Sequence, residues 1–437
     1  MCKWGKNINT HLFVLHSKVK LILPRILYIV SILAKKIVNG EKMSNIVILS
    51  TFYLNIPSAN GLCARNLVDA FRSKGHNVFV VCYDKKTLSD EPNREHVFTI
   101  PQLADKASGH LQKIKRMSRI LQGNITPLLK EKLVDLYYNR ICEISKIVKI
   151  DAIVAMFFPL EGIEAMYKFS SEMPKVKTII YELDSIGDGV LDFVTKNFYN
   201  RVYVSWLREK YKCVTSVVVM KSHEKYWINQ FGRDFANKMI VADLPIIVAR
   251  SQGKRQASNE PLKMIYSGLI EKRYRSPTYL LSVLQELEKK IEFEISFYSK
   301  GDCESEIAET AKNVKAIKRL GYVTPEELDK ATIEADFLVS IGNSVSRSVP
   351  SKLMSYISYG KPIIHFSSQK NDVCCEYLDK YPLALVVNQS DLVEKSCEKI
   401  VAFLENAKGK ILDYNFIQKE FILNDPKYSA ELILQMI

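Results

Sequence analysis

The segment "NIVILSTFYLNIPSANGLCARNLVDAFRSKGHNVFVVCY", residues 45–83, predicts a strand, a helix and a second strand in succession. Its first part, "NIVILST" (45–51), is a short apolar run typical of a strand that is buried on both faces. A helical pattern over 61–75 follows and ends at a glycine, and "HNVFVVCY" (76–83) is the next strand. This order indicates a βαβ unit and therefore a parallel sheet.

The same alternation continues along the chain and restarts once. Further strands are expected at 151–158, 176–184 and 215–220. Periodicity then fails over 243–261, where Gly, Ser, Gln and Asn accumulate, which indicates a linker. Beyond it, strands are expected at 263–268, 291–301, 314–321, 335–343, 361–366 and 383–387. We therefore expect an α/β protein with two tandem Rossmann-like domains and a ligand-binding cleft between them.

Length and composition agree with two globular domains. A chain of 437 residues exceeds the size of one ordinary hydrophobic core, and 47% apolar residues exclude disorder and a polytopic membrane protein. The nine cysteines are scattered and never spaced C-x-x-C, so we expect a reduced, cytosolic protein. No H-E-x-x-H or comparable cluster is present, and we expect no metal bound by a sequence-local motif.

Residues 1–42 form a basic, apolar extension. Eight Lys and Arg against Glu41 give it +7, which is half of the formal net charge of +14. Its longest uncharged run, 26–34, is too short to span a membrane, and Lys35-Lys36 with no cleavage site argues against a secretory signal. Two interpretations stay open: an interfacial membrane anchor, or a leader preceding a true start at Met43. Half of the net positive charge lies in this extension, and the sequence contains no basic motif with aromatic residues between the cations. Nucleic-acid binding is therefore not expected.

Three loops that follow strands carry candidate binding residues. In "FYLNIPSANG" (52–61), Ser58 or Asn60 can cap the helix that begins near Gly61, and the free N–H groups favour an anion; an ordinary capped turn is the alternative. In "IYSGLIEKRYRSP" (265–277), Gly268 precedes a cluster of Lys272, Arg273 and Arg275. Such a cluster suits phosphate oxygens, although runs of charge are also common on solvated surfaces.

The third loop leads into "SVPSKLMSYISYGKPIIHF" (348–366), which predicts a short helix followed by a buried strand. Ser348 is the expected cap, Pro350 suits the first turn, and Gly360 ends the helix. Ser351 and Lys352 then lie in the first turn, where the helix dipole disfavours a cation. A lysine in this position is reasonable if it meets an anion.

The pattern "PSKLMSYISYGKPII" resembles the donor-site helix of GT-B-fold glycosyltransferases, especially family-four-like bacterial enzymes of surface polysaccharide synthesis. Segments 58–81, 265–277 and 320–343 resemble the corresponding parts of that family, and the likeness covers essentially 43–437. It implies a GT-B fold in which the last helix, 426–437, crosses back onto the first domain. The expected domains are thus 43–245 with 411–437 on the acceptor side, and 246–410 for the nucleotide-sugar.

The resemblance also implies roles for individual residues. Lys352 and one of Arg273 or Arg275 would neutralise the donor diphosphate, close to Gly268. Asn343 and Ser351 would line the diphosphate–sugar pocket, and Tyr322 and Val323 would meet the base. Many retaining members carry two glutamates where this chain has Arg347 and Ser355, so neither the ribose contact nor the stereochemistry follows.

Two residues of the first domain are candidates for catalysis. Asp184 ends the strand in "YELDSIGD" and is interpreted as a base or an acceptor ligand, with a helix cap as the alternative. His110 is a weaker candidate for contact with sugar or phosphate. It precedes an amphipathic segment with Leu111, Ile114 and Met117 on one face and Lys115, Arg116 and Arg119 opposite, which is typical of a membrane-surface helix or of an ordinary surface helix.

The resemblance implies a metal-independent, hexosyltransferase-type enzyme on the cytoplasmic side, peripheral to the inner leaflet. It would move a sugar from a nucleotide-sugar, with a UDP-sugar favoured, to a lipid-linked saccharide, and it would need no cofactor beyond that co-substrate. Two alternatives stay open. One is a nucleotide-sugar 2-epimerase, which has the same fold, and the other is a non-catalytic binding subunit that has lost the glutamates.

Overall fold

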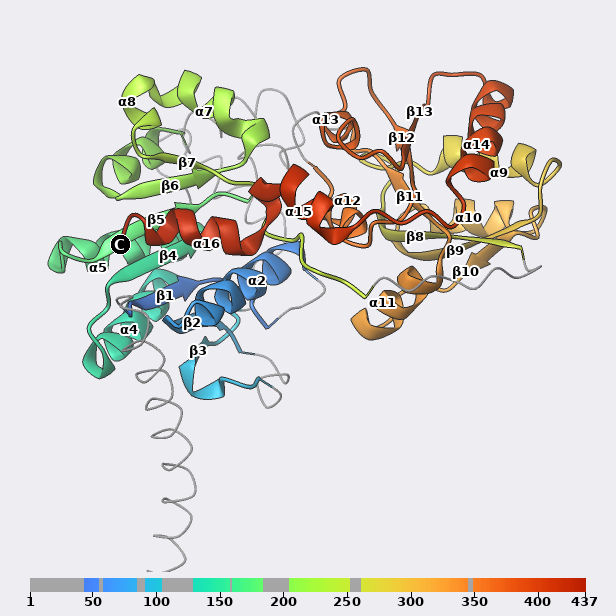
Figure 1. Cartoon of the computed structure of the whole chain (residues 1–437). Helices are drawn as coiled ribbons and strands as arrows, with labels where there is room; N and C mark the ends of the chain where they lie inside the picture. The colour runs from blue at the N-terminus through green and yellow to red at the C-terminus, as the bar shows by residue number, and fades with distance from the viewer. Residues whose placement is uncertain are drawn as a thin grey trace, which may run out of the picture.

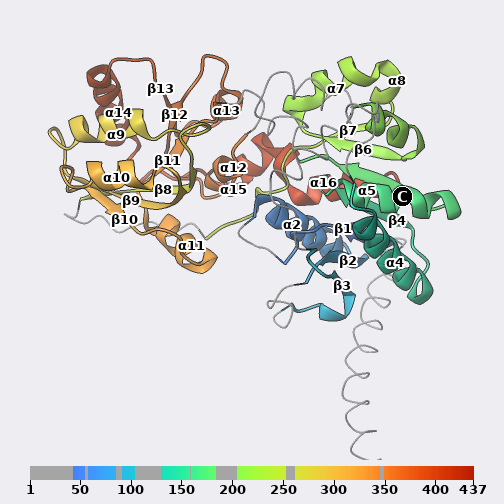
Figure 2. The same ribbon diagram turned by 180° about the vertical axis from the view of Figure 1, so that it is seen from behind.

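The computed structural model describes residues 43–54, 58–84, 91–103, 129–157, 159–183, 204–251, 261–344 and 349–437 (Figures 1 and 2). They contain a sheet of seven strands in the order β3-β2-β1-β4-β5-β6-β7 and one of six in the order β10-β9-β8-β11-β12-β13. Every pairing within the two sheets is parallel. In each sheet the strand order reverses beside the first strand, so two tandem Rossmann-like domains are confirmed.

The first sheet precedes the linker. Its strands are β1 (Asn45–Leu49), β2 (Asn77–Tyr83), β3 (Val97–Ile100), β4 (Ala152–Met156), β5 (Lys177–Tyr181), β6 (Ser216–Val219) and β7 (Met239–Val241). The helices between them are α2 (Ala59–Ser73), η2 (Arg94–His96), α4 (Glu131–Ile147), α5 (Leu160–Glu172), a helical stretch at 204–213, η3 (Lys221–His223), α7 (Glu224–Phe231) and α8 (Arg233–Ala236).

Both faces of the first sheet are buried, as its continuous apolar runs predict. On β1, Ile46 and Ile48 pack toward α2, whereas Val47 and Leu49 pack toward α4 and α5. Successive side chains of a strand point to opposite faces, so a strand between two helical layers needs apolar residues at every position.

Two strands of this sheet, β3 and β7, are absent from the sequence-based prediction. They are its edge strands, with four and three residues. Three of the four residues of β3 and two of the three of β7 are only half-buried. A short strand with one neighbour needs no long apolar run, and it therefore leaves little trace in the sequence.

The second sheet holds β8 (Leu262–Ile270), β9 (Phe293–Gly301), β10 (Ile317–Arg319), β11 (Phe337–Ile341), β12 (Ile363–Ser367) and β13 (Ala384–Asn388). All six match predicted strands. The accompanying helices are α9 (Thr278–Leu287), α10 (Glu304–Thr310), α11 (Pro325–Glu334), α12 (Ser351–Ile357), α13 (Val373–Leu378) and α14 (Val393–Ala407). Apolar residues of α9, α10 and α14 form one core against this sheet, and those of α12 and α13 form the other.

The last segment returns to the first domain, as the resemblance implies. It comprises α15 (Tyr414–Glu420), η4 (Ile422–Asn424) and α16 (Pro426–Leu434), and α16 lies beside α2 in both views (Figures 1 and 2). The Ser429 hydroxyl lies 3.1 Å from the Tyr181 hydroxyl, and Lys74 Nζ lies 2.5 Å from Glu431 Oε1. The crossover helix is therefore part of the first domain's packing.

The two passages of the chain between the domains are hydrogen-bonded to each other. The Asp243 amide donates to the Leu423 carbonyl at 2.8 Å, and Asn424 Nδ2 donates to the Leu244 carbonyl at 3.2 Å. The Asp243 carboxylate accepts from the Lys221 amide at 2.8 Å and from the Tyr377 hydroxyl of α13 at 3.0 Å. Asp243 thus joins the carboxyl end of β6 to the second domain.

Two predicted membrane-facing segments lie outside the described residues: the extension 1–42 and the amphipathic segment that includes Leu111 and Arg119. Of the helices that the structure does describe, none combines the length and apolar composition that crossing a bilayer requires.

We predict that Ile433→Ala, at a fully buried position of α16, lowers the free energy of unfolding of the first domain by about 2–4 kcal/mol. Glu431→Ala, two residues earlier on the exposed side of the same helix, is the matched control, with an expected change below about 1 kcal/mol. All three tryptophans, Trp4, Trp206 and Trp227, precede the linker, so urea unfolding followed by tryptophan fluorescence reports on this domain. Equal effects of the two substitutions would contradict the packing role of α16.

Candidate functional site

Gly268, Arg275 and Lys352 come together where β8 ends. The backbone of Gly268 has a φ of +148°, a conformation that L side chains rarely adopt. A Cβ placed on Gly268 would lie 3.8 Å from Lys352 Cγ and 3.9 Å from Arg275 Nη1. The two cationic side chains therefore flank this glycine. They lie at the reversal of strand order between β8 and β11, where open α/β sheets bind ligands.

Arg275 is held by two neighbouring loops. Its amide donates to the Glu271 carbonyl at 2.7 Å, and its Nε donates to Asn343 Oδ1 at 2.5 Å. Asn343 follows β11 and is buried, and its own carbonyl accepts from Gln369 Nε2 at 2.8 Å. Burial raises the pKa of the adjacent Tyr266 to about 12, and the positive charge of Arg275 opposes that rise.

Lys352 is a half-buried cation on a helix that is fastened to β8. The Tyr356 hydroxyl, one turn further along α12, accepts from the Ser267 amide at 2.7 Å. Within the part of the chain that the structure describes, the Lys352 ammonium has neither a hydrogen bond nor an ion pair. Burial, and in second place the charge of Arg250, lower its pKa from the ordinary lysine value. An anion would therefore be bound favourably beside Lys352.

The helix that carries Lys352 begins later than predicted. The cap residue of α12 is Pro350, so its expected place in the first turn is wrong, and Ser348, the expected cap, lies outside the described residues. Proline already has the extended backbone that a cap position needs and it loses no hydrogen bond there. Ser351 and Ser355 are half-buried on this seven-residue helix. In so short a helix, the side-chain cations contribute more to the binding of an anion than the helix dipole does.

The other cations of the 272–275 cluster point elsewhere. Lys272 and Arg273 are exposed, and the Arg273 guanidinium lies 5.4 Å from the centre of the Tyr274 ring. Of the two arginines that the resemblance offered, Arg275 is the one beside Lys352.

The structure does not bring the expected base-binding residues to the same cluster. Tyr322 is 67% exposed and Val323 is half-buried, between the edge strand β10 and α11. Among the described contacts, none joins either residue to Lys352 or Arg275. Their role in binding a base stays a prediction.

In the first domain, Ser58 is the residue that caps α2, because its hydroxyl accepts from the Gly61 amide at 2.9 Å. Asn60 and Gly61 lie in the first turn, and Gly61 is buried. Asp184 and His110 lie outside the described residues.

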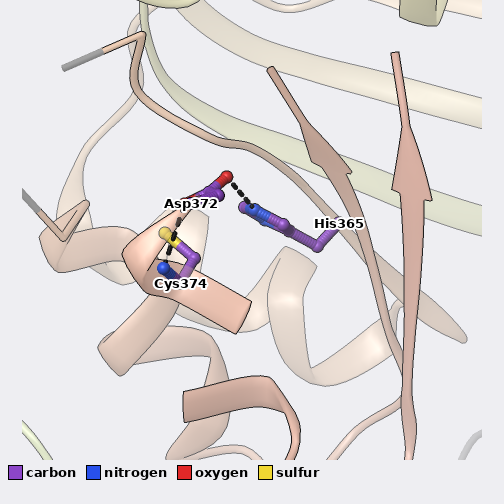
Figure 3. Close-up of side chains that lie close together, drawn as sticks. All are labelled: His365, Asp372 and Cys374. Atoms are coloured by element: carbon purple, nitrogen blue, oxygen red, sulfur yellow. Dashed lines mark hydrogen bonds and ion pairs between the residues drawn. The ribbon is translucent and has the colours of Figure 1, made fainter. Parts of the chain in front are cut away.

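A buried hydrogen-bonded group that the sequence analysis missed lies beside Gly342, and Figure 3 shows its members His365, Asp372 and Cys374. His365 Nε2 lies 3.0 Å from Asp372 Oδ2, His365 Nδ1 lies 3.2 Å from the Ser340 hydroxyl, and Asp372 Oδ1 accepts from the Cys374 amide at 2.9 Å. Burial disfavours the charge of Asp372, but its bonds to His365 and Cys374 outweigh that effect and lower its pKa. His365 and Asp372 are seven positions apart, and Asp372 and Cys374 are two positions apart. This spacing matches no sequence motif, so the sequence did not predict the group.

His365, Asp372 and Cys374 are also the group of potential metal ligands that the described residues contain. In this arrangement His365 Nε2 and both Asp372 oxygens are occupied by hydrogen bonds. Burial raises the pKa of the Cys374 thiol well above its ordinary value, which keeps the sulfur protonated. The three groups satisfy one another, and we assign them to holding the Gly342–Asn343 loop.

A second missed group lies at the end of β5, two residues before Asp184. Glu182 is fully buried, and its Oε1 lies 3.5 Å from Nδ1 of His223, which is also buried. The segment "YELDSIGD" drew attention to Asp184, because nothing in it records that Glu182 lies beside a histidine 41 positions later in the chain.

No family model and no curated protein matches the chain. Solved structures match it over nearly its whole length. Anabaena HepE in complex with UDP-glucose has a TM-score of 0.58, 11% identity, and 90% and 100% coverage of the two chains. The lipopolysaccharide outer core galactosyltransferase WaaB has a TM-score of 0.53, 11% identity, and 90% and 100% coverage. The UDP-GlcNAc 2-epimerase of Methanocaldococcus jannaschii has a TM-score of 0.55, 13% identity, and 90% and 99% coverage. At these identities the likeness establishes the fold, which is GT-B.

We predict that Gly342→Ala destabilises the second domain by about 1–3 kcal/mol, because the new Cβ would lie 2.1 Å from Asp372 Oδ2. Gly162→Ala is the matched control. Its Cβ would meet Leu49 at an ordinary 3.7 Å, and alanine is favoured over glycine in a helix by up to about 1 kcal/mol. Thermal unfolding compares the two, and an unchanged midpoint for Gly342→Ala would contradict the tight packing of this loop.

Lys352→Met should stabilise the free protein by on the order of 1 kcal/mol at neutral pH, since it removes a desolvated charge and keeps most of the side-chain volume. The lowered pKa means that the folded state binds this proton more weakly than the unfolded state does. Wild-type stability should therefore rise as pH increases toward the ordinary lysine value of 10.5, and the advantage of the variant should shrink. Urea unfolding at several pH values checks this; a less stable variant at neutral pH would indicate that an anionic partner is already present.

Proposed function

We propose that this protein is a glycosyltransferase that takes its sugar from a nucleotide-sugar whose diphosphate binds Lys352 and Arg275. The observation that carries the proposal is a half-buried lysine with no anionic partner among the described residues, beside an arginine and a glycine at the reversal of strand order. A diphosphate supplies the missing negative charge, and arginine and lysine are the side chains that bind phosphate oxygens best.

The chemistry follows from where charge develops. The bond between the anomeric carbon and the β-phosphate oxygen breaks, a new bond to the acceptor oxygen forms, and the acceptor proton passes to a base. The departing nucleoside diphosphate gains negative charge, which fixed cations stabilise most in the transition state. Lys352 and Arg275 would serve that purpose, and Asp184 is the candidate base.

The donor and acceptor are proposed on separate grounds. A UDP-sugar is favoured because a protein of the same fold has been solved with UDP-glucose. A lipid-linked saccharide acceptor at the inner leaflet agrees with the basic, apolar extension and with the similarity to a lipopolysaccharide galactosyltransferase. Surface polysaccharide synthesis is the process that we propose for this reaction.

A 2-epimerase is the second candidate, because an epimerase has the same fold with a comparable TM-score. The two activities differ in what they need. An epimerase converts UDP-GlcNAc without an acceptor, whereas a transferase releases the nucleoside diphosphate only when an acceptor is present. Incubation with UDP-GlcNAc alone, followed by NMR of the sugar, separates them.

We expect one of UDP, GDP, ADP and CMP to raise the thermal unfolding midpoint of the full chain by several degrees at saturation, because binding to the folded state adds RT ln(1 + [L]/Kd) to its stability. Lys352→Ala should abolish the shift. Lys395→Ala, an exposed lysine on α14, is the matched control and should retain it.

Stabilisation with no turnover on any nucleotide-sugar would favour a non-catalytic binding subunit. If no nucleotide stabilises the wild type, or if Lys352→Ala responds as the wild type does, the proposed diphosphate site is wrong.

A further inference from the structure

The linker between the domains carries a third cation toward the helix of Lys352. Arg250 is half-buried, and its Nη1 lies 3.6 Å from Asp329 Oδ1 of α11. Its guanidinium carbon lies 5.7 Å from the centre of the Tyr359 ring. The Tyr359 hydroxyl in turn donates to Asp329. Arg250 therefore belongs to the linker by sequence and to the second domain by its contacts.

Tyr359 and Lys352 lie on the same side of the α12 segment. They are seven residues apart, and Ser358 after the helix keeps a helical backbone, so the separation is close to two turns. A side chain packed over Tyr359 thus lies along the face that presents Lys352. The charge of Arg250 contributes to the lowered pKa of Lys352, which agrees with this placement.

The local charges do not balance. Lys352, Arg275 and Arg250 gather around α12, and Asp329 is the carboxylate that the described contacts place among them. The ion pair at 3.6 Å is longer than a charge-assisted hydrogen bond, which is about 2.7–2.9 Å. Moreover, Arg250 Nε is buried and donates no hydrogen bond within the described residues. Part of the hydrogen-bonding capacity of the Arg250 guanidinium is therefore unused by the described residues.

We propose that Arg250 is a third cation of the diphosphate site, and that a bound diphosphate competes with Asp329 for its guanidinium. The proposal rests on the proposed function, since it assigns one more residue to the same site. It also gives the linker a direct contact with the donor. Because the diphosphate would replace Asp329, donor binding would change which part of the second domain holds the linker.

Two substitutions with opposite expected effects test this. Arg250→Gln should weaken UDP binding by the full chain about tenfold or more, the effect of one charge-assisted hydrogen bond. Asp329→Asn should tighten UDP binding several-fold, because it removes the competing negative charge. The amide oxygen of the asparagine can still accept the hydrogen bond of the Tyr359 hydroxyl. The Asp329→Asn gain should largely disappear in the double variant. Isothermal titration calorimetry with UDP measures all three, and Arg208→Gln, an exposed arginine of the first domain, is the matched control.

The outcomes separate the two proposals. If the wild type binds UDP and Lys352→Ala does not, but Arg250→Gln binds as the wild type does, the role of Arg250 is wrong and the proposed function stands. If Arg250→Gln and Asp329→Asn both weaken binding, their contact is a structural clamp and the competition is overturned. If the wild type binds neither UDP nor any of GDP, ADP and CMP, the proposed diphosphate site is wrong. Arg250 then has no proposed ligand.

Discussion

The structure depends on a chain that crosses between its two domains twice at one place. The outgoing segment at Asp243 and the returning segment at Leu423 share a backbone hydrogen bond of 2.8 Å, and the Asn424 carbonyl accepts from the Ile246 and Ile247 amides at 3.1 Å. Apolar residues around this junction belong to one continuous core that reaches from α2 and α16 to α12 and α13. The two domains are thus held by buried contacts at the junction, and not by a linker alone.

Asp243 supplies the polar part of that junction. It is buried, which raises its pKa, and it is stabilised by the Lys221 amide and the Tyr377 hydroxyl. Tyr377 belongs to α13, the helix that Asp372 caps. Asp372 in turn contacts the loop of Gly342, whose neighbour Asn343 accepts from Arg275. A continuous set of contacts therefore runs from the junction to the candidate diphosphate site.

The site itself is defined by an excess of positive charge. Buried charges in folded proteins are usually paired, because an unpaired one costs free energy. Lys352 has no such partner within the described residues, and its neighbours Arg275 and Arg250 are cations as well. A ligand that brings two negative charges would resolve this imbalance, which is why we propose a diphosphate and not a neutral sugar or a single carboxylate.

Much of the fold could be predicted from the sequence, because a central parallel strand must be apolar on both faces and so leaves a continuous run. This holds for β1, β4, β11 and β12, which are buried almost throughout. The edge strands β10 and β13 were also predicted, although they are only partly buried. The edge strands β3 and β7 were not predicted, since a strand with one neighbour does not need to be apolar on both faces. The start of α12 was also misplaced, because proline is acceptable both at the cap position and in the first turn of a helix.

The sequence by itself determined the two-domain α/β architecture, the linker, the last helix and the cationic loops after β8 and β11, since these depend on local residue patterns. The return of the last helix to the first domain followed only from the resemblance. Only the tertiary structure decided that Arg275 and not Arg273 lies beside Lys352, that Arg250 reaches the same helix, and that His365 and Asp372 hold the Gly342–Asn343 loop. Such groupings join residues that are up to about a hundred positions apart. Their proximity arises from sheet order and from the double crossing at Asp243, and no local pattern in the sequence records it.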